Sequence, residues 1–432
     1  MNQKTSEMNR LGQTLRRAVD ARLQPEYLRL ASVAVLVVGG VLLCLSFATS
    51  DRGRTMFGTP LGNDFAGFYV AAQILDRGHE TQLYDRELHD QLYHALLPNL
   101  DPRDSIPYVH PPFVAGVLQP LTHLPYEAAV AVWLIISASL YGAGCWFLIR
   151  SLRNLPREQT PLILLVALSF EPFLMECWLG GQLSAVGFFS DAMAWLLFSR
   201  NRPIAAGMAL GLCFYKPTLL LLMLPLLVVG RCGRILLGMT MTGVLLAGLS
   251  LAFVGWDVSV GYLDVLLSFR KSTAGGGLQI VAWKYVDLNN ALRLLCGGKS
   301  PLQSAVFVVL FLVPFAWLVR TWWRWPALEA TQRQWLWAAT LAWLPVLNLY
   351  VGIYDSIFVV QSVLIAADAL LRERRSENPL TDSGLAYCTL AIVATAWFSQ
   401  SLARVSGAQL YTLALIALGI LELRLARRSS DS

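Results

Sequence analysis

Charged residues are scarce in this chain. Only 14% of the 432 residues are Asp, Glu, Lys or Arg, whereas 56% are hydrophobic. Soluble domains rarely have such a composition, because a folded core has to be covered with polar and charged side chains. The shortage of charge argues against an ordinary soluble enzyme and predicts an integral membrane protein.

Cysteine is also sparse, and the seven cysteines lie mostly inside apolar runs. No two of them have the spacing of metal ligands. His89 and His94 are five residues apart, which places them on different faces of a helix. We therefore expect no cofactor and no metal site, with a divalent ion between Asp64 and Asp355 left as an open alternative.

Tandem repeats, low-complexity segments and the ten-residue alternation of an outer-membrane β-barrel are all missing. Uncharged runs recur instead, and each can cross a bilayer as a helix with its backbone hydrogen bonds satisfied internally. Among them are residues 31–47, 128–149, 235–256, 301–319, 334–354 and 383–402. We expect an all-α polytopic protein with about 10–12 membrane helices in a single membrane domain, 1–432.

The formal net charge of +6 reflects membrane topology rather than nucleic-acid binding, because the basic residues cluster between apolar runs. The positive-inside rule places these clusters and the N-terminal residues 1–30 in the cytoplasm. The clusters are 15–17, 150–157, 199–203, 230–234, 320–324, 372–375 and 424–428. The first run, 31–47, is then a retained anchor rather than a signal peptide.

Two long polar stretches face outward in this scheme, a first outer loop at 48–110 and a second at 257–300. Short outward turns follow near Gly180 and Tyr354. The expected location is a bacterial inner membrane, with the outer loops in the periplasm. Two segments do not fit this alternation of cytoplasmic and outer loops. The proline-rich piece 111–124 is too short for an ordinary span, and 203–230 predicts a helical hairpin with Lys216 at its tip.

The first outer loop predicts two short amphipathic helices on the membrane surface, one after Asp64 and one from Asp85. Asp64 stands at the start of the first. Its simplest role is that of a helix N-cap, which aspartate and the preceding Asn63 both fill well.

Polar side chains also interrupt apolar surroundings further along the chain, at predicted outer ends. They are His110 in "YVHPPF", Gln182 in "LGGQLS", Lys216 in "YKP" and Asp355 in "IYDS". An ionisable group within a membrane segment is costly enough to indicate a functional site. Together these groups predict one outward cavity for a polar ligand.

The ordered set "DFxxFYxAA…LYD…PPF…LP…W…GQ…AGxxLGLxxxKP…YD" resembles the bacterial membrane mannosyltransferase-type family that uses polyprenol-phosphate sugars, with the C-type glycosyltransferase fold. The resemblance runs from about residue 63 to residue 355. It implies inverting transfer of a sugar, by family prior mannose, from a polyprenol-phosphate donor to an acceptor hydroxyl outside the membrane. The expected partners are this donor, a glycolipid or glycan acceptor and the lipid bilayer, without nucleic acid.

In that family the essential acid lies at the "DF" pair, which implies Asp64 as the catalytic base here. A carboxylate within hydrogen-bond reach can take the proton of a sugar hydroxyl as the new bond forms. The departing lipid phosphate needs positive charge, for which Lys216 is the first candidate. Arg270 and Lys271 follow, with Lys284 and Arg293 as further basic residues of the second outer loop.

Other residues have a site role and a structural alternative. Gln182 follows two glycines and could bond sugar hydroxyls, or simply end a helix. Asp355 could orient the acceptor, pair with Lys216, or cap the next helix. Tyr69 and His110 could stack on a sugar, although aromatic residues are also common at membrane interfaces. Lys216 could merely extend toward the interface.

Two other functions remain open at this stage. Glu171, Glu176 and Asp191 lie inside apolar segments, as in a proton path, and favour a transporter or flippase for a polar or lipid-linked solute. Against it, the chain has no paired inverted halves. A non-catalytic envelope scaffold would leave Asp64 and Lys216 without a purpose.

Overall fold

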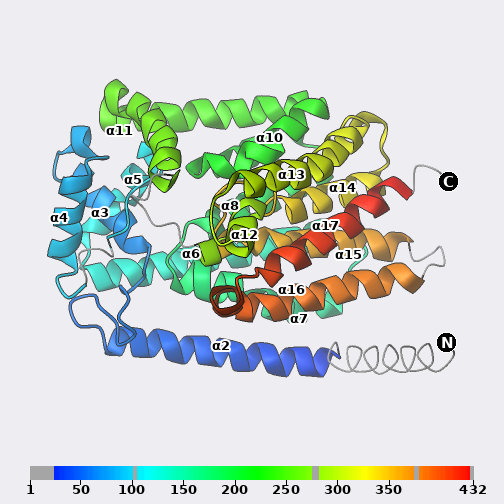
Figure 1. Cartoon of the computed structure of the whole chain (residues 1–432), viewed down its shortest axis with the longest axis horizontal. Helices are drawn as coiled ribbons and strands as arrows, with labels where there is room; N and C mark the ends of the chain where they lie inside the picture. Colours follow the sequence, from blue (N-terminus) through cyan, green and yellow to red (C-terminus); the bar gives the residue numbers. More distant parts are fainter. Residues whose placement is uncertain (1–23, 101–104, 275–281, 374–378, 429–432) are drawn as a thin grey trace.

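The computed structural model describes residues 24–100, 105–274, 282–373 and 379–428, without the side chains of 268–274, 379–383 and 428. The described chain is a bundle of helices (Figure 1). Its α-helices are α2 (Pro25–Ala48), α3 (Phe65–Asp76), α4 (Arg86–Leu96), α5 (Pro112–Leu118), α6 (Tyr126–Ser151), α7 (Thr160–Leu168), α8 (Ser184–Ser199), α9 (Pro203–Gly211), α10 (Leu220–Val229), α11 (Gly233–Ala274), α12 (Leu288–Leu295), α13 (Pro301–Trp322), α14 (Ala330–Trp343), α15 (Phe358–Glu373), α16 (Pro379–Ser406) and α17 (Leu410–Arg428).

Shorter helical turns connect them. One is a π-helix, η5 (Pro172–Leu179), and the others are the 3₁₀ turns η1 (Glu80–Gln82), η3 (Gln119–His123), η4 (Arg157–Gln159), η6 (Leu212–Tyr215), η7 (Pro217–Leu219), η8 (Ala282–Lys284), η9 (Trp325–Ala327) and η10 (Ile353–Ile357). Within the described ranges, strand pairing is limited to isolated bridges such as that between Tyr285 and Gly352.

Six of the described helices are long and apolar enough to cross a membrane, or up to seven if the bent pair α7 and η5 forms one span. This confirms the all-α polytopic class. The expected count of about 10–12 is approached only when shorter apolar helices such as α8 and the α9 to α10 hairpin are counted as well.

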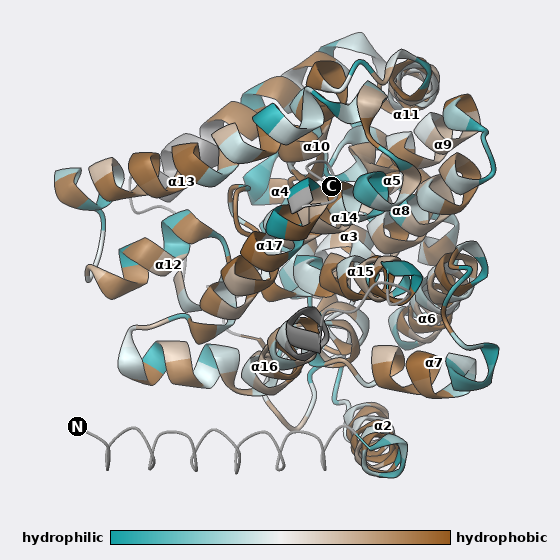
Figure 2. Ribbon diagram, turned by 90° about the vertical axis from the view of Figure 1, so that its right-hand side faces the viewer, coloured by the Kyte–Doolittle hydropathy of each residue, from teal (hydrophilic) through white to brown (hydrophobic). Residues whose placement is uncertain are grey.

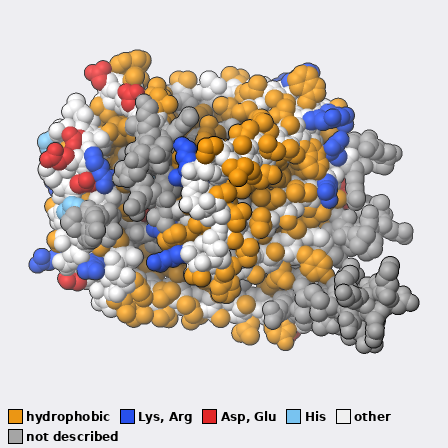
Figure 3. All heavy atoms as spheres, in the orientation of Figure 1, with side chains coloured by type: hydrophobic (Ala, Val, Ile, Leu, Met, Phe, Trp, Pro, Cys, Tyr) orange, Lys and Arg blue, Asp and Glu red, His pale blue; other side chains and the backbone are white. Residues whose placement is uncertain are grey.

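Helices at the outside of the bundle face lipid, and helices in the middle face other helices. In the end-on view of Figure 2, α2, α11 and α13 lie outside, whereas α8 and α14 lie in the middle. Only 11% of the apolar window of α2 and of α13 is buried, and the exposed face of α13 includes Val308, Val309 and Leu312. Hydrophobic side chains accordingly cover the centre of the face in Figure 3.

The basic clusters within the described residues gather at one end of the bundle, which we call the basic end. Asn154 donates its backbone N–H to Asp368, 2.6 Å away, which brings the loop after α6 to the end of α15. The rings of Phe198 and Trp325 lie 5.7 Å apart, which brings the end of α8 to the end of α13. Lys and Arg side chains mark this end at the right of Figure 3.

The predicted outward turns gather at the opposite end, which we call the loop end. Tyr126 donates its hydroxyl to the Leu61 carbonyl at 2.6 Å, so the chain enters the first outer loop and leaves it at the same end. Segment 111–124 therefore does not cross the bundle. It forms the short helices α5 and η3, which pack on α3, and α5 also packs on α11.

Segment 203–230 forms the predicted hairpin. Its start lies beside the start of α11, since Thr242 donates to the Met208 carbonyl at 2.9 Å, and α10 returns the chain to the start of α11. Lys216 lies at the tip with non-helical backbone angles, because the following Pro217 disfavours a helical conformation at the residue before it.

The first outer loop differs from prediction in one helix. α4 is amphipathic, as expected, with His89 and Tyr93 buried. α3 does not lie on the membrane surface, because ten of its twelve residues are buried, and it packs against α4, α5 and η3. Small residues such as Gly67 and Ala71 let neighbouring segments approach closely and cover the second face of the helix too.

Two turns meet closely at the loop end. Gly181 has a positive φ of 69°, and a Cβ built on it would lie 2.1 Å from the Gly62 carbonyl oxygen. Trp133 donates to the Gly181 carbonyl at 3.0 Å and holds the turn from the other side. Only glycine fits both the backbone angle and the space.

We expect Gly181→Ala to lower the free energy of unfolding by roughly 2 kcal/mol or more, from backbone strain and the clash with Gly62. The measurement is the melting temperature of the purified protein in detergent. Gly142→Ala is the matched control, since nothing lies within 4 Å of its added Cβ inside α6 and alanine favours a helix. Equal melting temperatures for the two variants would contradict the proposed packing.

Candidate active site

Asp64 occupies the N-cap position of α3, but its carboxylate does not cap the helix. Gln182 donates its side-chain amide to that carboxylate, and the Asp64 backbone N–H donates to the Gly180 carbonyl at 3.1 Å. Asp85 shows the contrast, because its carboxylate accepts the Leu88 N–H at 3.0 Å at the start of α4. The simple capping role predicted as an alternative for Asp64 is therefore wrong.

The surroundings of Asp64 change its proton affinity. Burial raises the pKa of its carboxyl to about 6, against the opposing effects of Lys284, the Gln182 hydrogen bond and Lys216. A carboxylate with a pKa of about 6 is ionised at neutral pH and still holds a proton better than an ordinary aspartate. These are the properties of a general base.

Lys216 and Asp355 form an ion pair. The Lys216 side chain is 17% exposed and that of Asp355 is fully buried. Ser184, at the start of α8, donates its hydroxyl to the second carboxylate oxygen of Asp355 at 2.7 Å. Lys216 also lies 4.8 Å from the ring centre of Tyr354. Lys216 therefore does not extend to the interface, and the carboxylate of Asp355 accepts from side chains rather than capping a helix.

Lys284 brings a second cation to Asp64. It lies in η8 at the end of the second outer loop, is exposed, and interacts electrostatically with Asp64 and with Glu176 of η5. Glu176 in turn bonds the Gln400 side chain. The two carboxylates thus share one exposed ammonium group.

The chain around Lys284 is held by two other segments of the loop end. The Val286 N–H donates to the Val351 carbonyl at 3.0 Å. Gln409, before α17, donates to the carbonyls of Trp283 and Tyr285 at 3.2 and 3.3 Å. This backbone network fixes Lys284 beside the turn that carries Asp355.

His110 lies on the other side of Lys216. Its Nδ1 is 3.1 Å from the Tyr215 carbonyl oxygen, and Tyr84 donates its hydroxyl to the His110 carbonyl at 2.8 Å. Burial lowers the pKa of the imidazole to about 4, with Lys216 acting in the same direction. His110 is therefore neutral at physiological pH and lines the site as a polar ring.

Tyr69 does not join these groups. Its ring is buried beside Tyr126, with a centroid distance of 5.3 Å, and its hydroxyl donates to the Leu124 carbonyl at 2.9 Å. It is a packing residue in this structure. The side chains of Arg270 and Lys271, near the end of α11, lie outside the described residues.

Sequence reasoning gave too little weight to several residues of this cluster. Ser184 and Tyr354 stand next to Gln182 and Asp355 in the quoted motifs, but a serine and a tyrosine at helix ends carry no specific signal. Glu176 was grouped with the acids of a possible proton path. Only the fold brings it to the first outer loop.

A family model described as glycosyltransferase family 87 matches residues 108–349, more than half of the chain. The chain belongs to glycosyltransferase family 87. No curated protein and no solved structure gave a match. The matched range of this membrane glycosyltransferase includes Gln182, Lys216 and Lys284, whereas Asp64 lies before it and Asp355 after it.

The family 87 glycosyltransferase should depend on the Lys216–Asp355 pair for stability. Lys216→Met leaves a fully buried carboxylate without its partner, which typically costs about 3–5 kcal/mol. Removing the second charge as well, in Lys216→Met with Asp355→Asn, should recover part of that loss.

The check is a double-mutant cycle of melting temperatures in detergent. The double variant should melt above Lys216→Met alone. Strictly additive losses would mean that the two side chains do not interact in the folded protein.

Proposed function

We propose that this protein is an inverting glycosyltransferase that moves a sugar, mannose as the first candidate, from a polyprenol-phosphate donor to an acceptor hydroxyl on the outer side of a bacterial inner membrane. The observation that carries the proposal is the position of Asp64. Its carboxylate is turned away from its own helix and toward Gln182 in a cluster of polar residues, in a chain of a glycosyltransferase family.

The proposed reaction is a single displacement at the anomeric carbon. The acceptor oxygen forms a bond to that carbon while the bond from the carbon to the phosphate oxygen breaks. The bonding electron pair leaves with the lipid phosphate. The acceptor proton passes to Asp64, whose raised pKa of about 6 matches this role.

Lys284 is better suited than Lys216 to the donor phosphate. The ammonium group of Lys216 is already compensated by the buried Asp355. Lys284 is exposed and acts on Asp64 from a distance, so a phosphate can approach it without breaking an internal ion pair. Charge of this kind stabilises a departing phosphate. Lys216 then acts as a positioning residue that holds Asp355.

The sugar would lie among the remaining polar groups. Gln182 has a second amide hydrogen and a carbonyl oxygen for sugar hydroxyls. Glu176 and the neutral ring of His110 offer further acceptors or apolar contact. Asp355 is held by Lys216 and Ser184 and keeps the floor of the site in place.

The orientation of the protein in the membrane is inferred from the position of its basic residues. The loop end, with Asp64, lies opposite the basic end, and the positive-inside rule assigns basic clusters to the cytoplasm. The site then faces the periplasm. A transporter remains the second candidate from sequence, but family membership favours transfer chemistry, and Glu176 is used at the site.

We expect Asp64→Asn to lower transfer about 10²- to 10⁴-fold, because the general base is lost. The melting temperature should be equal or higher. Burial raises the pKa above its unfolded value, so the charged carboxylate costs stability at neutral pH and asparagine removes that cost. The assay uses protein in lipid with radiolabelled polyprenol-phosphate sugars and a membrane-lipid extract.

The wild-type rate should also fall as the pH drops below about 6, where Asp64 gains a proton. Asp85→Asn, which changes an aspartate that does cap a helix, is the matched control and should keep its rate. Full activity of Asp64→Asn would contradict the role of Asp64 as the base. A loss of activity that is explained by a lower melting temperature of Asp64→Asn would contradict it as well.

Lys284→Gln should raise KM for the polyprenol-phosphate donor and lower kcat, because charge on the leaving phosphate loses its partner. Lys299→Gln is the control, since Lys299 is exposed in the same outer loop without a described contact to Asp64. Initial rates at varied donor concentration separate the two effects. Unchanged donor kinetics in Lys284→Gln would mean that another cation stabilises the donor phosphate.

A further inference from the structure

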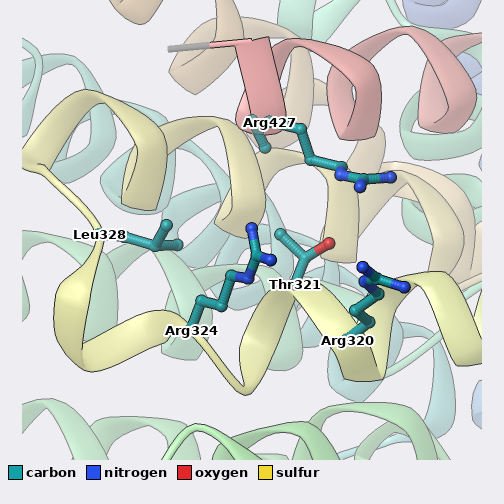
Figure 4. Close-up of a pocket in the computed structure, with 6 residues that line it drawn as sticks. Arg320, Thr321, Arg324, Leu328 and Arg427 are labelled. Atoms are coloured by element: carbon teal, nitrogen blue, oxygen red, sulfur yellow. The ribbon is translucent and has the colours of Figure 1, made fainter. Parts of the chain in front are cut away.

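Three arginines surround a hollow at the basic end, far from Asp64. Arg320 and Arg324 come from the end of α13 and Arg427 from the last turn of α17. Thr321, Leu328 and Ala426 complete the lining. Figure 4 shows the three guanidinium groups facing the space around Thr321. The hollow is shallow, with a cavity volume of about 10 Å³, and is open to solvent.

The arginines are not neutralised by acids that line the hollow, since its described lining contains none. Within the described ranges, the side chains of Arg320 and Arg324 have no ion pair. The nearest acid in sequence, Glu329, uses its carboxylate in the capping box of α14. Guanidinium groups repel one another, so their convergence is favourable when an anion lies between them.

The floor of the hollow is fixed and apolar. Leu328 is 8% exposed, Ala426 1% and Thr321 4%. The Thr321 hydroxyl donates to the Trp317 carbonyl at 2.9 Å, so it is not a donor for a ligand. The hydrogen-bond donors that the lining offers a ligand are therefore the guanidinium groups of Arg320 and Arg324, whose planar fork suits phosphate oxygens.

The hollow opens beside lipid. It lies at the end of α13, whose apolar face is exposed along most of its length. Positively charged pockets at the ends of membrane helices bind phosphate headgroups. We propose that Arg320 and Arg324, beside Arg427, bind the phosphate of an anionic phospholipid of the leaflet at the basic end, separately from the glycosyl donor and acceptor.

The test measures lipid binding by native mass spectrometry on the full chain, purified and delipidated in detergent. The probes are phosphatidylglycerol, phosphatidylcholine with the same acyl chains, and inorganic phosphate. The test variant is R320Q/R324Q. The matched control is R200Q/R202Q, which removes two exposed arginines from the α8 to α9 loop at the same end.

Wild type should bind the first phosphatidylglycerol more tightly than phosphatidylcholine. R320Q/R324Q should weaken the phosphatidylglycerol binding by roughly tenfold or more, since each basic residue near a membrane surface contributes measurably to binding of anionic lipid. R200Q/R202Q should bind as wild type does. Inorganic phosphate that competes with the lipid, in wild type only, would also support a phosphate site and would identify the free ion as a second source.

Equal phosphatidylglycerol binding by all three proteins would overturn the proposal. So would equal weakening in both variants, because general surface charge would then explain the binding. Melting temperatures in lipid-free detergent verify folding, and the single variants R320Q and R324Q replace the double variant if it melts lower. The readout does not involve transfer, so the result is independent of the proposed reaction.

Discussion

The contact between two turns at the loop end organises the whole site. The turn at Gly62 fits against Gly181 only because the latter has no side chain. This contact brings the Asp64 N–H to the Gly180 carbonyl and its carboxylate to Gln182. The same turn starts α8, whose Ser184 holds Asp355. A first outer loop that would otherwise lie on the membrane is thereby joined to the middle of the bundle.

The charges at this end divide into two kinds. The Lys216–Asp355 pair is internal, with both groups satisfied by protein, and it fixes the tip of the hairpin to the start of α15. Asp64 and Lys284 lie nearer to solvent and interact at longer range. The first kind gives the site its shape, and the second kind can change partners when a ligand enters.

Composition and apolar runs were enough to predict a helical membrane bundle, whereas its orientation in the membrane stays a prediction from the basic clusters. The pairing of Lys216 with Asp355 was open in the sequence and is confirmed. The burial of α3 was not predicted, because its second face of small residues is covered by segments such as α5 and η3, whose contacts arise only in the fold. The place of Glu176 depends on a π-helix after a 55° bend, which no periodicity of the sequence indicates.

The role of Lys284 could not be separated from that of other loop cations for a similar reason. Its position is set by backbone hydrogen bonds to Val351 from the neighbouring Val286 and by Gln409. Backbone pairing of this kind leaves no residue-type pattern in the sequence. The family match supports the chemistry, and the residues proposed to perform it are inferred from geometry.

The length of the α9 to α10 hairpin also determines how deep Lys216 lies in the membrane. α9 has nine residues and η6 four, which together rise about 21 Å, while the hydrocarbon layer is about 30 Å thick. A hairpin that starts at the basic end therefore stops about 10 Å before the opposite headgroups, and Lys216 lies at that level. If transfer takes place beside it with the proposed lipid-linked donor, that donor lies within the membrane, whereas the acceptor has to reach below the headgroups. Under the proposed reaction, this depth favours an acceptor that is thin and flexible enough to reach Lys216.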